Sequence, residues 1–166
     1  MYQVGETVFY GTEGVCRVEE IRQMRVNREN TEYYVLRPIY REGSTVFVPV
    51  KNELLVSRMR PLLTAEQIDK MIDEVNEADE DWIDDASERK AAFQQILLSA
   101  DRRDLLSMVR RLHLRRQNLE TVGKRLRTND EQMLRDAEKL LADEFSVVLN
   151  VKPREVPAYI VNKLKD

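Results

Sequence analysis

The sequence predicts an α+β protein of two domains, with a small antiparallel β-sheet or barrel over residues 1–60 and an all-α helical bundle over residues 61–166. Four of the five glycines lie in the first 43 residues, and five of the six tyrosines lie in the first 40. Apolar residues there alternate with polar ones, as in a half-buried strand, whereas after Pro61 they recur at helical spacing. This change of period places the domain boundary near Pro61.

The first domain is predicted to contain four short strands, because runs of aromatic and β-branched residues are bounded there by glycine, asparagine or proline. The runs cover residues 7–10, 15–18, 33–36 and 45–48. Gly11 and Gly14 bracket an expected tight turn, since glycine takes positive φ at little cost. Further turns are expected at residues 27–30 and 41–43. Pro49 has no N–H to donate, so it is expected at a strand end or on an edge strand.

Cap signals set the expected starts of three helices in the second domain. A capping box, in which two residues satisfy each other's orphan backbone amides, is expected at Thr64 with Gln67 and again at Thr128 with Glu131. Ser87 is expected to cap the helix between these two.

Apolar stripes at helical spacing follow these caps and predict the core of the second domain. Pro153 is expected in the first turn of a last short helix. The predicted core residues are Ile68, Met71, Ile72, Val75, Phe93, Ile96, Leu97, Leu105, Met108, Val109, Leu112, Met133, Leu134, Ala137, Leu140, Leu141, Phe145, Val148, Ile160, Val161 and Leu164.

Composition argues against several classes of protein. A single cysteine, Cys16, and a single histidine, His113, exclude an intramolecular disulfide framework and a closed Cys/His zinc site within one chain. One cysteine fits a reducing compartment, so we expect a cytoplasmic protein. The apolar runs are too short for a transmembrane helix, and the N-terminus does not resemble a secretory signal.

Signs of catalysis are weak. Neither a glycine-rich phosphate loop nor a nucleophile elbow is present in the sequence. We interpret His113 as structural or exposed and Cys16 as a small buried hydrophobe. The carboxylates at residues 79–81 and 84–85 leave a glycosidase-like or a metal-binding site conceivable, and stoichiometric binding of a divalent metal in calorimetry would support an enzyme. We expect no enzyme, no cofactor and no small-molecule substrate.

The net charge of −3 hides two blocks of opposite sign. Residues 61–88 carry a net charge of −10 and residues 89–127 a net charge of +8. Guanidinium groups bind phosphate through a bidentate fork, and the three acids within the basic block cannot neutralise its eleven bases. The block therefore favours an anionic partner such as nucleic acid. The alternative is that the two blocks face each other or are solvated surfaces.

Trp82 is the only tryptophan and lies between two helical patterns. One interpretation is a core residue between the domains, because large aromatic side chains dominate packing. The other is an apolar wedge against an unstacked base step in the minor groove of DNA. The acidic neighbours of Trp82 would repel phosphates, which counts against the second interpretation.

The sequence resembles the CarD/CdnL family over nearly its whole length. The similarity lies in residues 4–10, residues 14–21, residues 33–36, residues 46–50, Trp82 and the helix over residues 128–145. The first of the two domains also resembles the polymerase-interacting module of transcription-repair coupling factors. The resemblance implies a bacterial transcription regulator whose Tudor-like β-domain binds the RNA polymerase β subunit. It also implies a helical domain that contacts promoter DNA and stabilises the open complex, with Trp82 as the wedge.

Two sets of candidate contact residues follow. The edge strand near residues 45–48, with residues 24–26 beside it, is expected to pair with the polymerase. Its predicted contacts are Met24, Arg25, Val26, Thr45, Val46, Phe47 and Val48. The predicted DNA contacts, without sequence specificity, are Trp82, Arg89, Lys90, Arg110, Arg111, Arg115, Lys124 and Arg125.

A second function remains open at this point. The chain could be a protein-only adaptor whose basic helix binds an acidic protein face. That adaptor predicts no crosslinks from residues 89–127 to promoter DNA in the assembled complex. For either function we expect a monomer and no membrane association.

Overall fold

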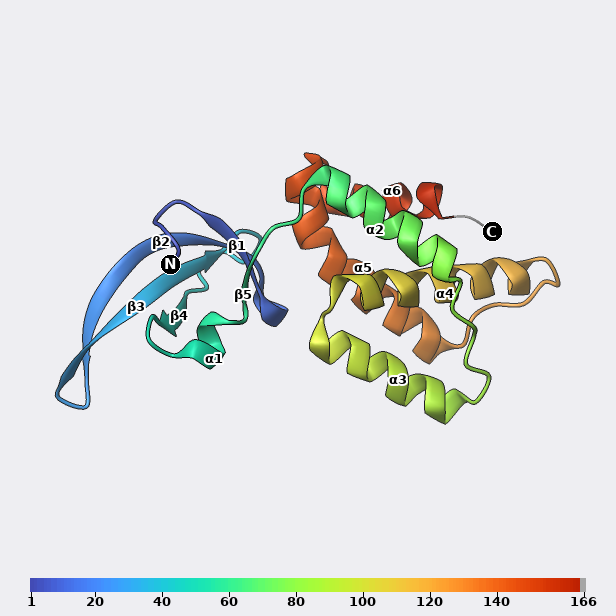
Figure 1. Cartoon of the computed structure of the whole chain (residues 1–166). Helices are drawn as coiled ribbons and strands as arrows, with labels where there is room; N and C mark the ends of the chain where they lie inside the picture. Colours follow the sequence, from blue (N-terminus) through green and yellow to red (C-terminus); the bar gives the residue numbers. More distant parts are fainter. Residues whose placement is uncertain (165–166) are drawn as a thin grey trace. The chain divides into compact units, whose positions relative to one another are not determined.

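The computed structural model describes residues 1–164, without the side chain of Thr12, and divides into two compact units (Figure 1). The first unit is Met1–Leu62 and the second begins at Leu63, two residues beyond the boundary that the sequence predicts. Residues 165–166, at the end of the predicted helical domain, lie outside the described residues. An antiparallel sheet comes first in the chain and helices follow, so the predicted fold class is confirmed.

The first unit is a five-stranded antiparallel sheet with the strand order β4-β3-β2-β1-β5. Its strands are β1 (Thr7–Tyr10), β2 (Gly14–Val26), β3 (Glu29–Pro38), β4 (Val46–Pro49) and β5 (Met59–Pro61). A 3₁₀ turn, η1 (Gly11–Glu13), joins β1 to β2, and a short helix, α1 (Glu53–Val56), precedes β5. The elements α1 and β5 are not predicted from the sequence, because segments of four and three residues carry too little periodicity to detect.

The turns of the sheet lie where glycine and asparagine predict them. Gly11 and Gly14 have φ values of 45° and 76°, and Asn27 and Arg28 have φ values of 50° and 66°. Two successive residues with positive φ form the tight β2–β3 hairpin. Pro49 ends β4, which lies at one edge of the sheet, as predicted.

Strands β2 and β3 are longer than predicted. They pair from Cys16 opposite Pro38 to Val26 opposite Glu29, with an irregular register between Val18 and Glu20. Beyond Ile21 the strand is mostly exposed, so no buried face imposes an alternation of apolar and polar residues there. The turn and the backbone hydrogen bonds therefore set the register of the hairpin. Its outer half has no alternation of apolar and polar residues from which the strands could be predicted.

The buried cluster of the first unit lies on one face of this sheet, whereas Phe9, Val15 and Val35 are buried on the opposite face, because side chains alternate along a strand. Cys16 is buried in this cluster, as predicted, and its thiol contacts the carbonyl of Gly14 at 3.7 Å. The buried cluster consists of Val8, Cys16, Val18, Tyr34, Leu36, Val48 and Met59.

The second unit is a helical bundle with its own core. Its helices are α2 (Ala65–Ala78), α3 (Ala86–Ser99), α4 (Arg102–Glu120), α5 (Thr128–Leu149) and α6 (Val156–Lys163), with a 3₁₀ turn, η2 (Pro153–Glu155), before α6. Helices α2, α3 and α5 all pack against α4. Every predicted core residue of this unit is buried or half-buried. Pro153 opens η2 immediately before α6, close to its expected place.

The predicted capping box of α2 is confirmed, whereas the predicted cap of α3 is wrong. The amide of Gln67 donates to Thr64 Oγ1 at 3.1 Å, and the amide of Thr64 donates to Gln67 Oε1 at 2.9 Å. In α3, Asp85 rather than Ser87 is the cap, and it accepts from the amide of Glu88 at 2.8 Å. A carboxylate at this position also complements the positive end of the helix dipole.

The predicted capping box of α5 is also wrong. Thr128 is the first residue inside the helix, and the N-cap is Arg127, which makes no side-chain cap hydrogen bond. The box needs its threonine outside the helix, with an extended backbone that turns the hydroxyl toward the third amide. Thr128 therefore cannot play that part.

Replacing Thr64 by alanine is expected to lower the free energy of unfolding by about 1 kcal/mol, because the amide of Gln67 loses its acceptor, Thr64 Oγ1. Thr128→Ala is the matched control and is expected to change it by less than about 0.5 kcal/mol. Urea denaturation followed by circular dichroism measures both. Equal losses in the two variants would contradict the assignment of the caps.

No helix formed by residues 1–164 combines the length and the apolar character that a bilayer span requires.

Candidate functional site

Trp82 lies in the linker between α2 and α3 and is half-buried against the helical core. Its indole meets the ring of Phe93 edge-on, with 6.3 Å between the ring centroids. The described ring contacts of Trp82 are all within the helical unit, so the core interpretation holds in a modified form. The exposed part of the indole remains available to a partner.

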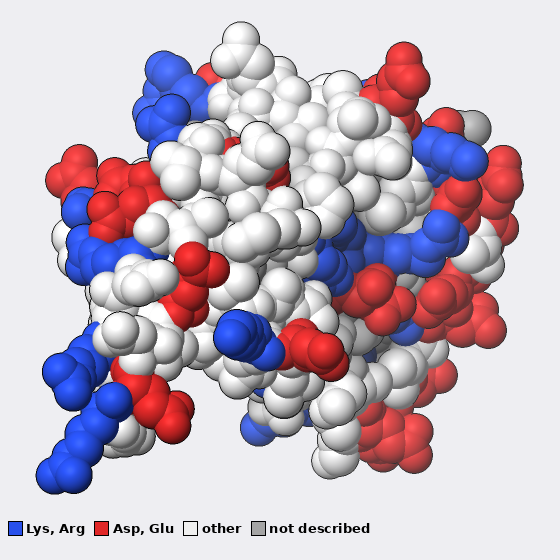
Figure 2. Space-filling model, turned by 60° about the vertical axis from the view of Figure 1, so that its left-hand side comes forward, with Lys and Arg blue, Asp and Glu red and all other residues white. Residues whose placement is uncertain are grey.

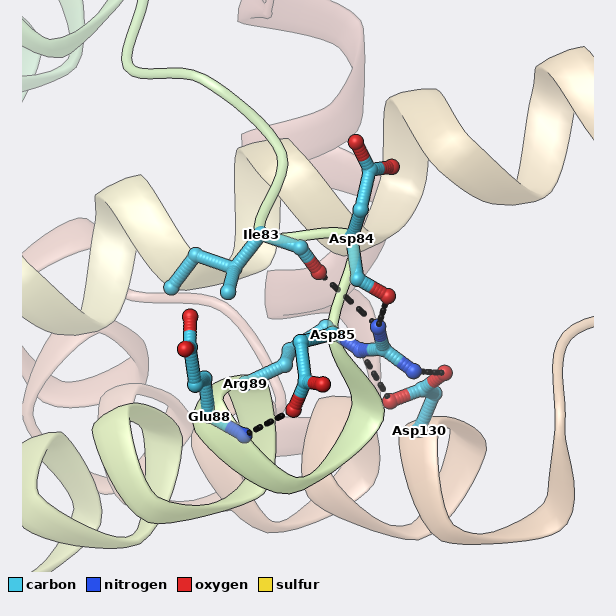
Figure 3. Close-up of polar contacts among 6 residues, drawn as sticks. All are labelled: Ile83, Asp84, Asp85, Glu88, Arg89 and Asp130. Atoms are coloured by element: carbon cyan, nitrogen blue, oxygen red, sulfur yellow. Dashed lines mark hydrogen bonds and ion pairs between the residues drawn. The ribbon is translucent and has the colours of Figure 1, made fainter.

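Arg89 joins three segments of the helical unit around this linker (Figure 3). Its Nε and Nη2 each donate to one carboxylate oxygen of Asp130 at 2.9 Å. Its Nη1 donates to the backbone carbonyls of Ile83 at 2.9 Å and Asp84 at 3.2 Å. The side chains of Arg89 and Asp130 are each only 6% exposed. Arg89 therefore links α3 to α5 and to the backbone that directly follows Trp82.

Two guanidinium groups also contact the face of the indole. The central carbon of Arg89 lies 4.6 Å from the ring centroid of Trp82, and that of Arg115, from α4, lies 5.6 Å from it. Cations at these distances are attracted by the electron-rich face of the ring. Trp82 is thus held among positive charges despite its acidic neighbours in the sequence.

Three ion pairs join residues 74–80 of the acidic block to the basic helix α4. Arg103 pairs with Glu74, Arg110 pairs with Asp79 at 2.8 Å, and Arg111 pairs with Glu80 at 3.5 Å. The alternative in which the two charge blocks face each other therefore holds for this part of the molecule. Figure 2 shows acidic and basic side chains lying next to each other at several places on the surface.

Arg110 and Arg111 have little contact with solvent. Their side chains are 5% and 9% exposed, whereas those of their partners Asp79 and Glu80 are 72% and 54% exposed. Burial lowers the pKa of Arg111, and the charges of Glu80 and Asp104 oppose that shift. Arginine keeps its charge far above neutral pH, so both groups act here as fixed internal cations.

A cavity of about 270 Å³ opens beside Trp82. Its lining combines apolar residues from the core with a larger number of basic than acidic side chains. Asp130, one of its two acids, is already paired with Arg89, so the lining has a net positive charge. The lining residues are Trp82, Asp84, Arg89, Arg115, Leu119, Lys124, Arg125, Leu126, Arg127 and Asp130.

The structure separates the predicted DNA contacts into two groups. Arg115, Lys124 and Arg125 are exposed and lie around the cavity with Trp82. Lys90 is exposed on α3 and lines a neighbouring hollow together with Arg127. The other group is buried against carboxylates and consists of Arg89, Arg110 and Arg111.

Arg127 and Asp130 were absent from the predicted site. Arg127 ends the basic run that begins at Lys124, and this run was a usable signal. Nothing in the sequence distinguishes Asp130 from the other acids of its helix, because its partner is 41 residues away in the chain.

The second candidate surface is the open edge of β4. This strand pairs only with β3, with Val48 opposite Tyr34 and Phe47 opposite Val35. The amide of Val50 donates to the carbonyl of Glu32 at 2.9 Å. Bonded and non-bonded pairs alternate along an antiparallel ladder, so the N–H and C=O of Phe47 point away from β3.

Side chains on this edge differ in what they present. Phe47 is 42% exposed and meets Tyr33 edge-on, Thr45 is exposed, and Val46 is half-buried. Val48 is fully buried, and the same alternation directs its backbone N–H and C=O toward Tyr34 of β3, so it offers no group at the open edge.

The expected position of residues 24–26 beside this strand is wrong. Met24, Arg25 and Val26 belong to β2 and pair with residues 29–31 on the opposite side of β3. The strand β3 therefore separates them from β4.

Among the described residues, no group of three or more histidine, cysteine, aspartate or glutamate side chains is placed to hold a metal ion. His113 is buried in α4, and its Nδ1 lies 3.3 Å from Arg116.

Comparison with protein families gives two matches that together span most of the chain. A model described as the CarD-like/TRCF RID domain matches residues 2–62. A model described as the CarD C-terminal domain matches residues 70–161, which is more than half of the sequence.

Proposed function

Because the chain belongs to the CarD family of non-enzymatic transcription regulators, we propose that its helical unit contacts promoter DNA and stabilises the open complex while its β unit binds the RNA polymerase β subunit. The resemblance found in the sequence is thereby confirmed, and the family makes this a transcription-associated protein that interacts with RNA polymerase. The DNA contact, its effect on the open complex and the residues at both surfaces are our proposal.

The observation that carries the DNA proposal is a half-buried indole beside a basic cavity. An apolar ring of this kind fits against an unstacked base step, and the neighbouring cations neutralise phosphates on either side of it. Arg115, Lys124 and Arg125 are the exposed cations that we assign to phosphate contact. Arg89, Arg110 and Arg111 already have carboxylate partners, so we assign them to the support of this surface.

The acidic flanks of Trp82 make the intrinsic affinity for DNA weak, because exposed carboxylates such as Asp81 repel phosphates. Attachment to polymerase overcomes this by raising the effective concentration of DNA near the helical unit. A regulator that acts only on assembled promoter complexes therefore needs no strong free binding.

Replacing Lys124 and Arg125 together by alanine is expected to weaken the salt dependence of open-complex stabilisation, by roughly one unit of logarithmic slope for each phosphate that is no longer neutralised. Arg154→Ala, an exposed cation beyond the other end of α5, is the control and should leave the slope unchanged. The lifetime of a polymerase–promoter complex is measured over a series of salt concentrations.

Equal slopes in the double variant and in the parent protein would contradict phosphate contact at this site. Crosslinking then separates the adaptor function from DNA binding. Crosslinks from residues 89–127 to promoter DNA support the proposal, and crosslinks to protein alone support the adaptor.

For the β unit, the open edge of β4 is the surface that supports polymerase binding. An exposed edge offers backbone donors and acceptors to a strand of the partner, and the exposed Phe47 ring adds apolar contact. Thr45, Val46 and Phe47 lie on or beside this edge. Met24, Arg25 and Val26 lie on the far side of β3, so we assign them no part in the added strand.

Phe47→Pro is expected to weaken binding to the polymerase β subunit about tenfold or more, because it removes the outward N–H that a partner strand would use. The ladder to β3 stays intact, since that N–H does not take part in it. Phe47→Val is the matched control, which trims the ring but keeps the N–H, and it should lose less affinity. Both are measured by titrating the full-length protein, with circular dichroism to verify the fold. Equal affinities for Phe47→Pro and Phe47→Val would contradict strand addition at β4.

A further inference from the structure

The linker that carries Trp82 has no regular secondary structure. Residues 79–85 form neither helix nor strand, so no backbone ladder sets the position of the indole. Its position depends instead on side chains from the surrounding helices. The start of the linker is held by Arg110, which donates to Asp79 at 2.8 Å.

Ile83 and Asp84 directly follow Trp82 in the linker. In the hydrogen bonds described for these two residues, the partner is always Arg89. Both carbonyls accept from Nη1 of this residue, while Nε and Nη2 are occupied by Asp130 (Figure 3). The same guanidinium lies over the indole face at 4.6 Å. One planar group therefore fixes both the backbone after Trp82 and one face of its ring.

We propose that Arg89, oriented by Asp130, is a positioning residue that holds the Trp82 linker in the geometry needed for its partner. The inference rests on the proposed function of Trp82, although the positioning itself can be tested without DNA. Asp130 lies at the third position of α5, and this helix packs in the core. The Arg89–Asp130 pair therefore connects the linker to a rigid helix.

A lysine could not replace Arg89 in this role. The guanidinium uses three nitrogens in a fixed plane to reach a carboxylate and two carbonyls, whereas an ammonium offers one nitrogen. Buried ion pairs often add little stability relative to apolar residues of similar volume. A positioning role therefore explains this pair better than a contribution to stability does.

The experiment compares Arg89→Lys with Arg102→Lys in the full-length protein. Arg102 is the matched control because its Nε donates to the buried Glu144 at 2.6 Å, and this pair makes no described contact with residues 79–85. Trp82 is the only tryptophan, so intrinsic fluorescence reports on its position alone. Acrylamide quenching and fluorescence anisotropy measure how accessible and how mobile the indole is.

In Arg89→Lys we expect stronger acrylamide quenching and lower anisotropy of Trp82, because the indole is no longer held in place. We also expect the open-complex lifetime to be shortened roughly three- to tenfold, because a contact group moved from its required position binds its partner less well. In Arg102→Lys we expect a loss of stability with unchanged fluorescence and lifetime. A second variant, Arg89→Met with Asp130→Leu, replaces the pair by apolar side chains and should show the same change in fluorescence while remaining folded.

Unchanged quenching and anisotropy in Arg89→Lys would overturn the inference, and so would equal changes in Arg102→Lys. Failure of the proposed function gives a different result. In that case the fluorescence changes in Arg89→Lys as expected, but neither this variant nor Trp82→Ala alters the open-complex lifetime.

Discussion

An Asp130→Ala variant is expected to have a free energy of unfolding about 3–5 kcal/mol below that of the parent protein. Both carboxylate oxygens of Asp130 accept hydrogen bonds from Arg89, and only 6% of each of the two side chains is exposed to solvent. Removing the carboxylate leaves a buried guanidinium whose only described polar partners are the carbonyls of Ile83 and Asp84. The desolvation of an uncompensated charge is what makes the effect large.

Chemical denaturation at neutral pH measures this loss. Asp136→Ala, an exposed acid on the same helix, is the control and should change the free energy of unfolding by less than about 0.5 kcal/mol. The paired replacement Arg89→Met with Asp130→Leu should recover most of the loss, because no buried charge remains. Similar losses for Asp130→Ala and Asp136→Ala would show that the pair is not buried in solution.

A Trp82→Ala variant is expected to shorten the lifetime of the promoter open complex about tenfold, which corresponds to about 1.4 kcal/mol, while polymerase binding is unchanged. Of the described linker residues that line the basic cavity, Trp82 is the one with a large apolar side chain, and its indole is partly exposed. Its removal takes away the proposed contact with the base step but leaves β4 untouched. Trp82→Phe should give an intermediate lifetime, because a smaller ring still stacks.

The effect of weaker packing must be separated from the effect on DNA, since Trp82 also packs against Phe93. Tyr159→Ala is the matched control: this half-buried aromatic ring in α6 packs on the same core but does not line the basic cavity. It should lower stability without altering the open-complex lifetime. If Tyr159→Ala and Trp82→Ala shorten the lifetime equally, the wedge proposal fails.

The partners of the charged residues could be predicted from the sequence only in part. Counting acids within the basic block left most of its arginines without partners, which favoured an anionic ligand for all of them. Folding brings the acidic end of α2 and the linker against α4, where Arg110 and Arg111 meet Asp79 and Glu80. Among the predicted DNA contacts, the cations that remain exposed are Lys90 on α3, Arg115 toward the end of α4, and Lys124 and Arg125 in the loop after it.

The helix caps also depend partly on the sequence and partly on the tertiary structure. Thr64 with Gln67 and Thr128 with Glu131 have the same spacing, yet only the first pair forms a capping box. The difference is whether the threonine lies outside the helix or is its first residue. That depends on where the preceding loop joins the bundle.

The sequence alone determined the fold class, the order of the main elements, the turns of the sheet and the apolar face of each helix. These features follow from interactions between residues a few positions apart, such as strand and helix periodicity, positive φ at turns and restricted φ at proline. Only the tertiary structure decided which arginines are buried, that Asp130 meets Arg89 across 41 residues, and that β3 separates residues 24–26 from β4. Such contacts depend on how packed helices and paired strands align distant segments, and no local pattern of residues specifies that alignment.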